Sequence, residues 1–290
     1  MHYVIGDVHG CFDDLMRLLD KIEKQDSKAK IIFVGDFIDR GPDVLKTLNW
    51  FMENITAKGK YQCVLGNHED MILDWYTEYV HWLSAGWKNS HNPPSTHFDF
   101  SDSLKKAGLL EESYVTKVIA FFRRLPLRKK VVVKTAKGKK LTYLIAHAWD
   151  EENPHNSAEY RRYINLWERK LGGNHYDDKI VVHGHTPTVL DEYIRSGHVA
   201  PGLIGYRQGD INLDGGGVFG KYNQSYPCMI GAICLETLEE FYPYTIEERL
   251  AMLNSDYSCE EVQALVDAYK DIYMSQENPY RKDMLERLQN

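Results

Sequence analysis

Five short apolar runs along the chain all end in the same way, and this repeated pattern limits the possible folds more than any other feature. Each run is rich in β-branched or aromatic residues and stops at an Asp, Asn or His side chain, often after a Gly. The junctions are Tyr3-Val4-Ile5 before Gly6-Asp7, Ile31-Ile32-Phe33-Val34 before Gly35-Asp36, Cys63-Val64-Leu65 before Gly66-Asn67-His68, Tyr143-Leu144-Ile145-Ala146 before His147, and Ile180-Val181-Val182 before His183-Gly184-His185. Runs this short predict strands rather than helices.

Helical patterns separate the first of these strands. Residues 13–24 repeat apolar side chains at helical spacing behind an acidic first turn, and a second helix is predicted after Pro42 and Asp43. Alternating strands and helices predict βαβ units, in which the carboxyl ends of the parallel strands share one edge of the sheet. Ligands of open α/β sheets bind at that edge, so we expect the polar residues to meet there.

The rest of the chain divides by pattern. Residues from about 71 to 127 are helical and aromatic, which indicates a helical cap inserted between strands. Strands return from Lys130, with a hairpin turn predicted at 137–139, and the segment after about Tyr244 is helical. A length of 290 residues suits one large domain. We expect a domain over 1–240 and a helical C-terminal extension over 241–290 packed on it.

Composition excludes several classes of protein. A net charge of −7 provides no overall positive field for nucleic acid or an anionic membrane surface, and no apolar run is long enough to span a bilayer. The five cysteines are odd in number and lack CxxC spacing, so free thiols in a reducing compartment are expected. A first strand directly at the N-terminus leaves no room for a signal peptide, and a cytoplasmic location is the default expectation.

The polar residues after the strands have the chemistry of a metal site. Asp7 and His9 are two residues apart, so at a strand end they point to one side and can share a cation. Mixed oxygen and nitrogen ligands suit a borderline divalent metal. Each motif alone is an ordinary turn sequence. Together they predict a metal centre built from Asp7, His9, Asp36, Asn67, His147 and His185.

The ordered motifs resemble those of the calcineurin-like metallophosphoesterase superfamily and, within it, the phosphoprotein phosphatase family. The matching segments are GDVHG (6–10), GDFIDRG (35–41), GNHED (66–70), HAW (147–149), HGHTP (183–187) and NLDGGGVFG (212–220). The last is similar to the closing strand of bacterial and phage serine/threonine protein phosphatases. The resemblance covers roughly residues 1–240. It implies an α/β fold, a four-layer αββα sandwich of two mixed β-sheets flanked by helices.

The resemblance also implies a role for each residue. Asp7, His9 and Asp36 would hold one metal, and Asp36 would bridge to a second held by Asn67, His147 and His185. A hydroxide shared by the metals would attack phosphorus in line. His68 would then protonate the leaving oxygen, oriented by Asp39.

Arginines are expected to bind the phosphate. Arg40 follows Asp39 in the second motif, and Arg169 ends a Leu166-Trp167-Glu168-Arg169 segment similar to one in the bacterial and phage phosphatases. A guanidinium binds phosphate oxygens in a bidentate manner. Arg161, Arg162 and Arg207 are weaker alternatives.

The resulting interpretation is a phosphomonoester hydrolase with two divalent metal ions, manganese first and iron or zinc as alternatives. A serine/threonine protein phosphatase acting on a phosphorylated protein, or on a small phosphorylated substrate, is the first choice. A symmetrical dinucleoside tetraphosphate hydrolase is the main alternative, and a nucleic-acid end phosphatase is a third. A metal-dependent binding scaffold without activity is the non-enzyme alternative, and the retained His68 and Asp36 argue against it.

The sequence departs from the family pattern at two positions and contains one glycine-rich segment that only partly matches a phosphate-binding loop. Trp149 stands where the family usually has Gly, which predicts a narrower or more aromatic substrate entrance, and His183 is interpreted as a strand histidine rather than a ligand. The glycine-rich segment 214–221 lacks the Ser or Thr that a phosphate-binding loop requires and is predicted to be a hairpin.

Overall fold

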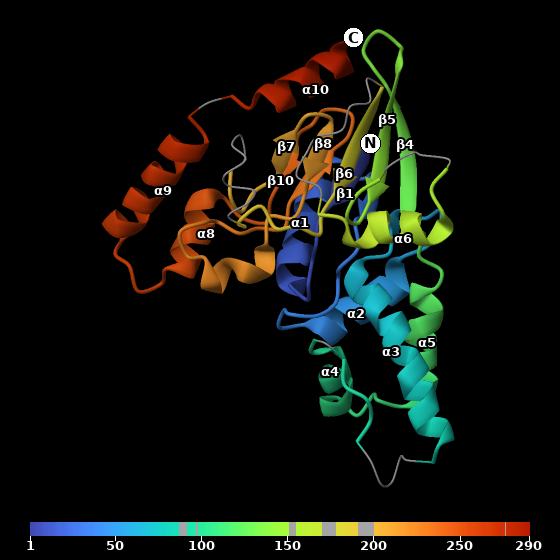
Figure 1. The fold of residues 1–290 in the computed structure, drawn as a ribbon. Helices are drawn as coiled ribbons and strands as arrows, with labels where there is room; N and C mark the ends of the chain where they lie inside the picture. The colour runs from blue at the N-terminus through green and yellow to red at the C-terminus, as the bar shows by residue number, and fades with distance from the viewer. Residues whose placement is uncertain (87–91, 97, 151–154, 170–177, 191–199, 276) are drawn as a thin grey trace.

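Two five-stranded mixed sheets lie face to face at the centre of the fold (Figure 1). The computed structural model describes residues 1–86, 92–96, 98–150, 155–169, 178–190, 200–275 and 277–290. The first sheet has the strand order β10-β9-β1-β2-β3 and the second has the order β4-β5-β6-β8-β7. In each sheet three neighbouring strands are parallel, and antiparallel strands complete the edges.

Five of the six parallel strands, β1, β2, β3, β5 and β6, are the ones that the apolar runs predicted, with small shifts of their bounds, and β8 is the sixth. The first sheet contains β1 (His2–Ile5), β2 (Lys30–Phe33), β3 (Tyr61–Cys63), β9 (Ala232–Cys234) and β10 (Glu240–Phe241). The second contains β4 (Arg128–Lys134), β5 (Lys140–Ala146), β6 (Lys179–His183), β7 (Gly205–Arg207) and β8 (Asp210–Asn212). The predicted hairpin turn joins β4 to β5, where the amide of Gly138 donates to the carbonyl of Thr135.

Alternating side chains in each strand separate the layers of the core. In β1, Tyr3 and Ile5 belong to the cluster under the helices, whereas Val4 points toward the second sheet. Val4 packs there in one cluster with Tyr143 of β5 and Val182 of β6. Strands buried on both faces are the reason why the runs read as continuously apolar.

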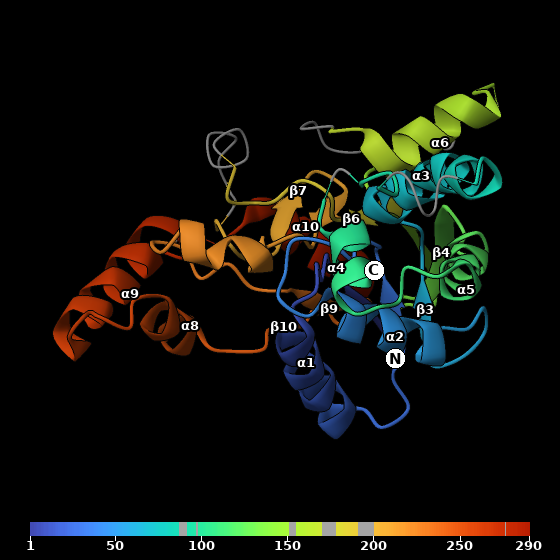
Figure 2. The same ribbon diagram turned by 90° about the horizontal axis from the view of Figure 1, so that it is seen from below.

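Helices cover both outer faces of the two sheets (Figures 1 and 2). The first sheet shares its outer core with α1 (Phe12–Gln25), α2 (Val44–Asn54), α3 (Asn67–Ser84), α4 (Phe100–Lys106) and α5 (Glu112–Phe122). On the second sheet, Ile164 of α6 (Ala158–Trp167) packs against Leu144 and Val181. The chain ends in α8 (Ile246–Leu253), α9 (Cys259–Tyr273) and α10 (Pro279–Gln289). The expected αββα sandwich of two mixed sheets is therefore confirmed.

Two local expectations were wrong. Residues 214–221 do not form a hairpin, because β8 ends at Asn212 and a 3₁₀ helix, η2, occupies Gly217–Tyr222. Trp149 does not line an entrance, because its side chain is 2% exposed and packs with Leu144 beneath α6.

The cysteines are free thiols, as expected, and only Cys259 is exposed. Among the described helices, none combines the length and the apolar character needed to cross a membrane.

Phe37 provides a test of the core below the site. Its ring is fully buried, stacks on Phe51 with 4.1 Å between centroids, and meets Phe122 edge-on. We expect Phe37→Ala to lower the free energy of unfolding by about 3–5 kcal/mol, because it leaves a cavity in a close-packed aromatic cluster. Urea denaturation measures the change. The exposed Val132 in β4 is the control, and Val132→Ala is expected to change stability by only about 0.5 kcal/mol. Equal losses in the two variants would contradict the assignment of Phe37 to the core.

Candidate active site

All six residues predicted as metal ligands meet at the carboxyl ends of the parallel strands. Asp7 and His9 follow β1, Asp36 follows β2, Asn67 follows β3, His147 follows β5 and His185 follows β6. Each of the six is at most 8% exposed. Two sheets therefore contribute side chains to one buried cluster.

Asp36 occupies the centre of this cluster. Its Oδ2 atom lies 3.3 Å from Nε2 of His147 and 3.6 Å from Nε2 of His9. Two groups of potential ligand atoms, each within 4.8 Å of one another, share this carboxylate. They are His9, Asp36 and His68 in one group, and Asp36, His147 and His185 in the other. The arrangement suits a carboxylate that contacts two cations.

Asp7 and Asn67 join the cluster through close contacts with His185 and His147. The amide of His185 donates to Asp7 Oδ2 over 3.1 Å. A Cβ at Gly184 would lie only 1.9 Å from Asp7 Oδ1, so glycine is required for this approach. The Oδ1 atom of Asn67 lies 2.7 Å from Nε2 of His147 and 3.0 Å from Nδ1 of His185.

Backbone carbonyls determine the tautomers of two histidines. Nδ1 of His9 donates to the carbonyl of Ile38 at 2.9 Å, and Nδ1 of His147 donates to the carbonyl of Val34 at 3.0 Å. A carbonyl only accepts, so the neutral rings carry their protons on Nδ1 and direct the lone pair of Nε2 into the cluster. Burial lowers the pKa of His9 to about 3, which keeps this ring neutral at ordinary pH.

The loop after β2 has an unusual backbone. Asp36, Asp39 and Arg40 all have positive φ, at 49°, 66° and 68°. His9 and His185 also have positive φ, so strained backbone is concentrated at the site. The buried carboxylate of Glu69 holds this loop, because it accepts hydrogen bonds from the amides of Asp36, Phe37, Ile38 and Gly66.

Three buried carboxylates dominate the electrostatics. Burial, together with the charges of Asp214 and Asp36, raises the pKa of Asp7 well above its ordinary value. Burial also raises the pKa of Asp214, to about 6. Burial opposes ionisation of Asp36 as well, but the imidazoles of His147, His68 and His9 hold its pKa well below the usual range. Excess buried negative charge of this kind favours a bound cation.

The donor atoms fit divalent metal ions. With its proton on Nδ1, His147 faces the carbonyl oxygen of Asn67 at 2.7 Å with a lone pair on each atom, a repulsion that a shared cation would remove. Nε2 of His185 is buried and has no hydrogen-bond partner in the described part of the chain. These residues can hold a metal pair on chemical grounds.

A histidine and a carboxylate lie next to the metal-binding cluster. Nδ1 of His68 donates to Asp39 Oδ2 at 2.8 Å, and both side chains are 1% exposed. Burial raises the pKa of Asp39, although the hydrogen bond from His68 acts in the opposite direction. Nε2 of His68 points toward the cluster and lies 3.8 Å from Asp36 Oδ2.

The predicted phosphate-binding arginines differ in their surroundings. A guanidinium nitrogen of Arg40 lies 2.9 Å from Nε2 of His9, and the group also covers the ring of Phe98. Arg169 is exposed just after α6, and its charge contributes to the lowered pKa of His185, where burial is the main cause.

Two of the weaker arginine candidates are paired with other carboxylates. Arg162 forms an ion pair with Asp70, and Arg207 forms one with Asp210 at 2.8 Å. His183 lies 3.4 Å from the same Asp210 and meets Trp149 edge-on, as expected of a strand histidine.

Two residues of the site were not singled out from the sequence. Asp214 follows β8 as the other polar residues follow their strands, and this repeated signal could have identified it. Glu69 was recognised only as part of a motif. Its role depends on amides in a loop more than 30 positions earlier, which no local pattern reveals.

Comparison with known proteins identifies the family. Residues 3–214 match the family model described as calcineurin-like phosphoesterase. A symmetrical bis(5'-nucleosyl)-tetraphosphatase from Shewanella oneidensis is 35% identical over 130 residues, which are 45% of this chain and 40% of that protein. The corresponding protein from Shewanella sediminis is 41% identical over 72 residues, 25% of each chain. The matched segments thus span less than half the length of these curated relatives.

Solved structures show weaker similarity. A protein serine/threonine phosphatase from Saccharomyces cerevisiae aligns with a TM-score of 0.45 and 16% identity, over 73% of this chain and 65% of its own. A metallophosphoesterase from Sphaerobacter thermophilus aligns with a TM-score of 0.43 and 15% identity, over 91% of this chain and 98% of that protein. Similarity of this size does not bear on the substrate.

Proton competition at Asp7 leads to a prediction about metal binding. The raised pKa values of Asp7 and Asp214 mean that protons occupy these carboxyl groups as the pH falls, whereas the low pKa values of His9 and His185 keep both rings neutral. A metal must displace those protons, so we expect Mn²⁺ to raise the Tm more at pH 8 than at pH 5.5. Thermal unfolding with Mn²⁺ and with EDTA at each pH measures this difference. An equal or larger increase of the Tm by Mn²⁺ at pH 5.5 would show that protonation of Asp7 does not compete with metal binding.

Proposed function

The chain belongs to the calcineurin-like phosphoesterase family, and we propose that it is a metal-dependent phosphomonoester hydrolase whose substrates are phosphorylated serine and threonine residues of proteins. The observation that carries the proposal is the buried cluster around Asp36, with the hydrogen-bonded His68 and Asp39 beside it. This arrangement combines cation ligands, a proton donor and an arginine within one site. Each of these components can contribute to metal-dependent hydrolysis of a phosphate ester.

The proposed ligands divide into two sets that share one carboxylate. Asp7, His9 and Asp36 would hold one metal, and Asp36, Asn67, His147 and His185 would hold the other. Manganese is the first choice, and iron and zinc are alternatives that the same mixed donors accept. When bound, such metals neutralise phosphate charge and lower the pKa of water so that it becomes a nucleophile at neutral pH.

The protein's own side chains perform the remaining steps. Arg40 binds phosphate oxygens, and its contact with His9 places the guanidinium at the edge of the cluster. Arg169 approaches from the side of His185 and is the second proposed phosphate contact. As the bond from phosphorus to the ester oxygen breaks, Nε2 of His68 gives its proton to that oxygen, and the alcohol leaves. Asp39 orients His68 and stabilises its protonated form.

The division of the chain is part of the same proposal. Residues 1–240 form the phosphoesterase domain, with a helical cap at about 71–127, and residues 241–290 are an extension packed on it. Tyr269 of α9 packs against Leu203 and Met229, and Met284 of α10 joins the core between the sheets. These contacts support an extension that is integral to the domain.

A second function has one specific observation in its favour. The curated relatives from Shewanella carry the name of a symmetrical dinucleoside tetraphosphate hydrolase. The aromatic cap residues that could stack on a base give this alternative little support. Trp75 and Trp82 are only 5% and 7% exposed in the core, the partly buried Tyr76 is covered by Arg123, and Trp87 lies outside the described residues.

Turnover of p-nitrophenyl phosphate tests the catalytic proposal. We expect hydrolysis with Mn²⁺, and loss of at least about 10³-fold in kcat for Asp36→Asn, because the shared carboxylate is removed from both metal sites. His68→Ala removes the proton donor and is expected to reduce kcat by about 10²- to 10⁴-fold. Metal content, measured by elemental analysis, is expected to stay near the wild-type level in His68→Ala. Absence of any turnover in the Mn²⁺-loaded wild-type protein would refute the proposal.

A rate comparison tests the choice of substrate. The protein is given a phosphothreonine peptide and diadenosine tetraphosphate under identical conditions, and kcat/KM is measured for each. We expect the peptide to be the better substrate, by about tenfold or more. A preference for the dinucleotide would assign the alternative function while leaving the same residues in the site.

A further inference from the structure

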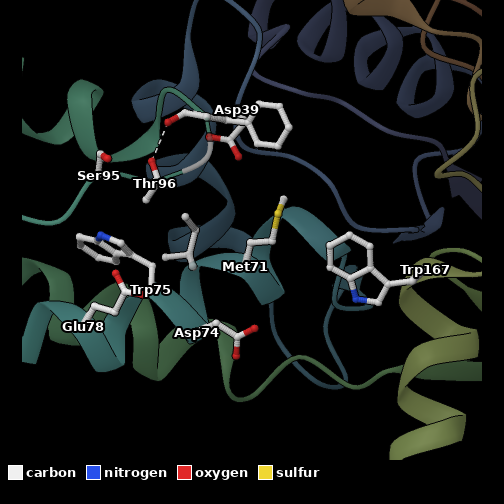
Figure 3. Close-up of a pocket in the computed structure, with 10 residues that line it drawn as sticks. Asp39, Met71, Asp74, Trp75, Glu78, Ser95, Thr96 and Trp167 are labelled. Atoms are coloured by element: carbon white, nitrogen blue, oxygen red, sulfur yellow. Dashed lines mark hydrogen bonds between the residues drawn. The ribbon is translucent and has the colours of Figure 1, made fainter.

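A pocket of about 470 Å³ opens directly beside the candidate active site. Ten residues line it: Asp39, Met71, Ile72, Asp74, Trp75, Glu78, Ser95, Thr96, Phe98 and Trp167. Figure 3 shows Trp75, Glu78, Ser95 and Thr96 toward one end and Trp167 at the other. Helix α3 supplies one side of the pocket through Met71, Asp74, Trp75 and Glu78.

Aromatic side chains join this pocket to the reacting groups. The ring of Phe98 lies 4.5 Å from the ring of His68, between centroids, and the guanidinium of Arg40 covers Phe98 at 5.2 Å. On the other side, Trp167 meets His185 edge-on at 6.4 Å. Asp39 belongs both to the pocket wall and to the pair with His68. A substrate whose phosphate reaches Arg40 therefore has neighbouring groups within reach of the pocket.

The charge of the pocket has one sign. Asp39, Asp74 and Glu78 are acidic, and none of the described lining residues is a lysine, arginine or histidine. Asp74 and Glu78 are exposed on α3, where they are four positions apart and thus on the same face. The Oδ1 atom of Asp39 is buried and has no hydrogen-bond partner among the described residues, so a buried acceptor also lies at the pocket wall.

We propose that this pocket binds a lysine or arginine side chain that flanks the phosphorylated residue of a substrate protein. The proposal rests on the proposed phosphatase function and adds a sequence preference to it. The carboxylates of Asp74 and Glu78 bind the cationic head group, while Phe98 and Met71 contact its aliphatic stem. Lysine and arginine are the only standard side chains that combine a long apolar stem with a fixed positive charge.

The same charge disfavours a dinucleoside tetraphosphate in this pocket. The phosphate chain of that ligand is strongly anionic. Any of its phosphates placed beside Asp74 and Glu78 would be repelled by their negative charges. Trp75 gives a base little surface for stacking, because its ring packs on Tyr79 and its Nε1 donates to the carbonyl of Pro94. The pocket therefore favours a cationic peptide segment.

Peptide kinetics test the preference. The substrates are two phosphothreonine peptides of equal length, one with arginines on both sides of the phosphorylated residue and one with glutamines there. We expect the wild-type protein to prefer the arginine peptide by about three- to tenfold in kcat/KM, as two partly exposed ion pairs allow. The preference should weaken as the salt concentration rises.

A double substitution and a matched control separate local charge from net charge. Asp74→Asn with Glu78→Gln is expected to remove the preference while leaving p-nitrophenyl phosphate turnover unchanged, because neither residue contacts the reacting groups. Asp271→Asn with Glu260→Gln changes the net charge equally on α9, on the opposite side of the molecule from α3 in both views, and is expected to keep the preference (Figures 1 and 2).

Three results would overturn the proposal. The first is equal kcat/KM values for the two peptides in the wild type. The second is an equal effect of the two double substitutions on the peptide preference. The third is that Asp74→Asn/Glu78→Gln lowers kcat/KM more for diadenosine tetraphosphate than for the arginine peptide. Fluorescence polarisation of the labelled arginine peptide with EDTA-treated protein measures pocket binding without turnover. If Asp74→Asn/Glu78→Gln binds this peptide more weakly and the α9 control does not, the pocket is supported even when p-nitrophenyl phosphate is not hydrolysed. Failure of the catalytic proposal is therefore distinguishable from failure of the pocket proposal.

Discussion

The buried carboxylate of Glu69 is the interaction on which the arrangement of the site depends. Its two oxygens accept hydrogen bonds from four amides, those of Asp36, Phe37, Ile38 and Gly66, over 2.9–3.3 Å. These bonds hold the loop after β2 against the start of α3 and satisfy donors that water cannot reach. Burial raises the pKa of Glu69 well above its ordinary value, so the loop geometry is maintained at an electrostatic cost.

The geometry held by Glu69 explains the close approach of the neighbouring loops. Gly35 has a φ of 100°, and a Cβ there would lie 2.5 Å from the amide nitrogen of Gly66. The two loops can touch only because both residues are glycine. This contact brings the carboxylate of Asp36 to the amide of His68, which donates to Asp36 Oδ1 at 3.0 Å. The central carboxylate and the proposed proton donor are thereby fixed relative to each other.

Helix α3 connects the chemistry to the proposed substrate preference. Its first residues, Asn67 and His68, face the metal-binding cluster, and the next two turns carry Asp74 and Glu78 along the acidic pocket. A group bound at the pocket therefore lies on the same helix as His68. The first turn of α3 thus carries residues of the family motif, and the following turns carry the acidic residues of the proposed substrate preference.

Much of the site was predictable from local sequence. Asp7, His9, Asp36, Asn67, His147 and His185 each follow a short apolar strand, and the rule that parallel strands end at one sheet edge predicts that they lie together. The alternation of strands and helices likewise indicated the α/β class. These features depend on neighbours in the chain, which is why a pattern of residues reveals them.

Other features depended on contacts between distant segments. Trp149 lies two positions after the proposed ligand His147 but packs in the core beneath α6, whereas Trp167 and Phe98, from separate segments, flank the site. The segment after β8 forms a 3₁₀ helix instead of a hairpin, and the acidic pocket joins α3 to Ser95, Thr96 and Phe98 and to the end of α6. The sequence by itself determined which polar residues end the parallel strands and so meet at the candidate site, apart from Asp214 and Glu69. Only the tertiary structure decided which side chains surround them, because packing between segments far apart in the chain sets those contacts.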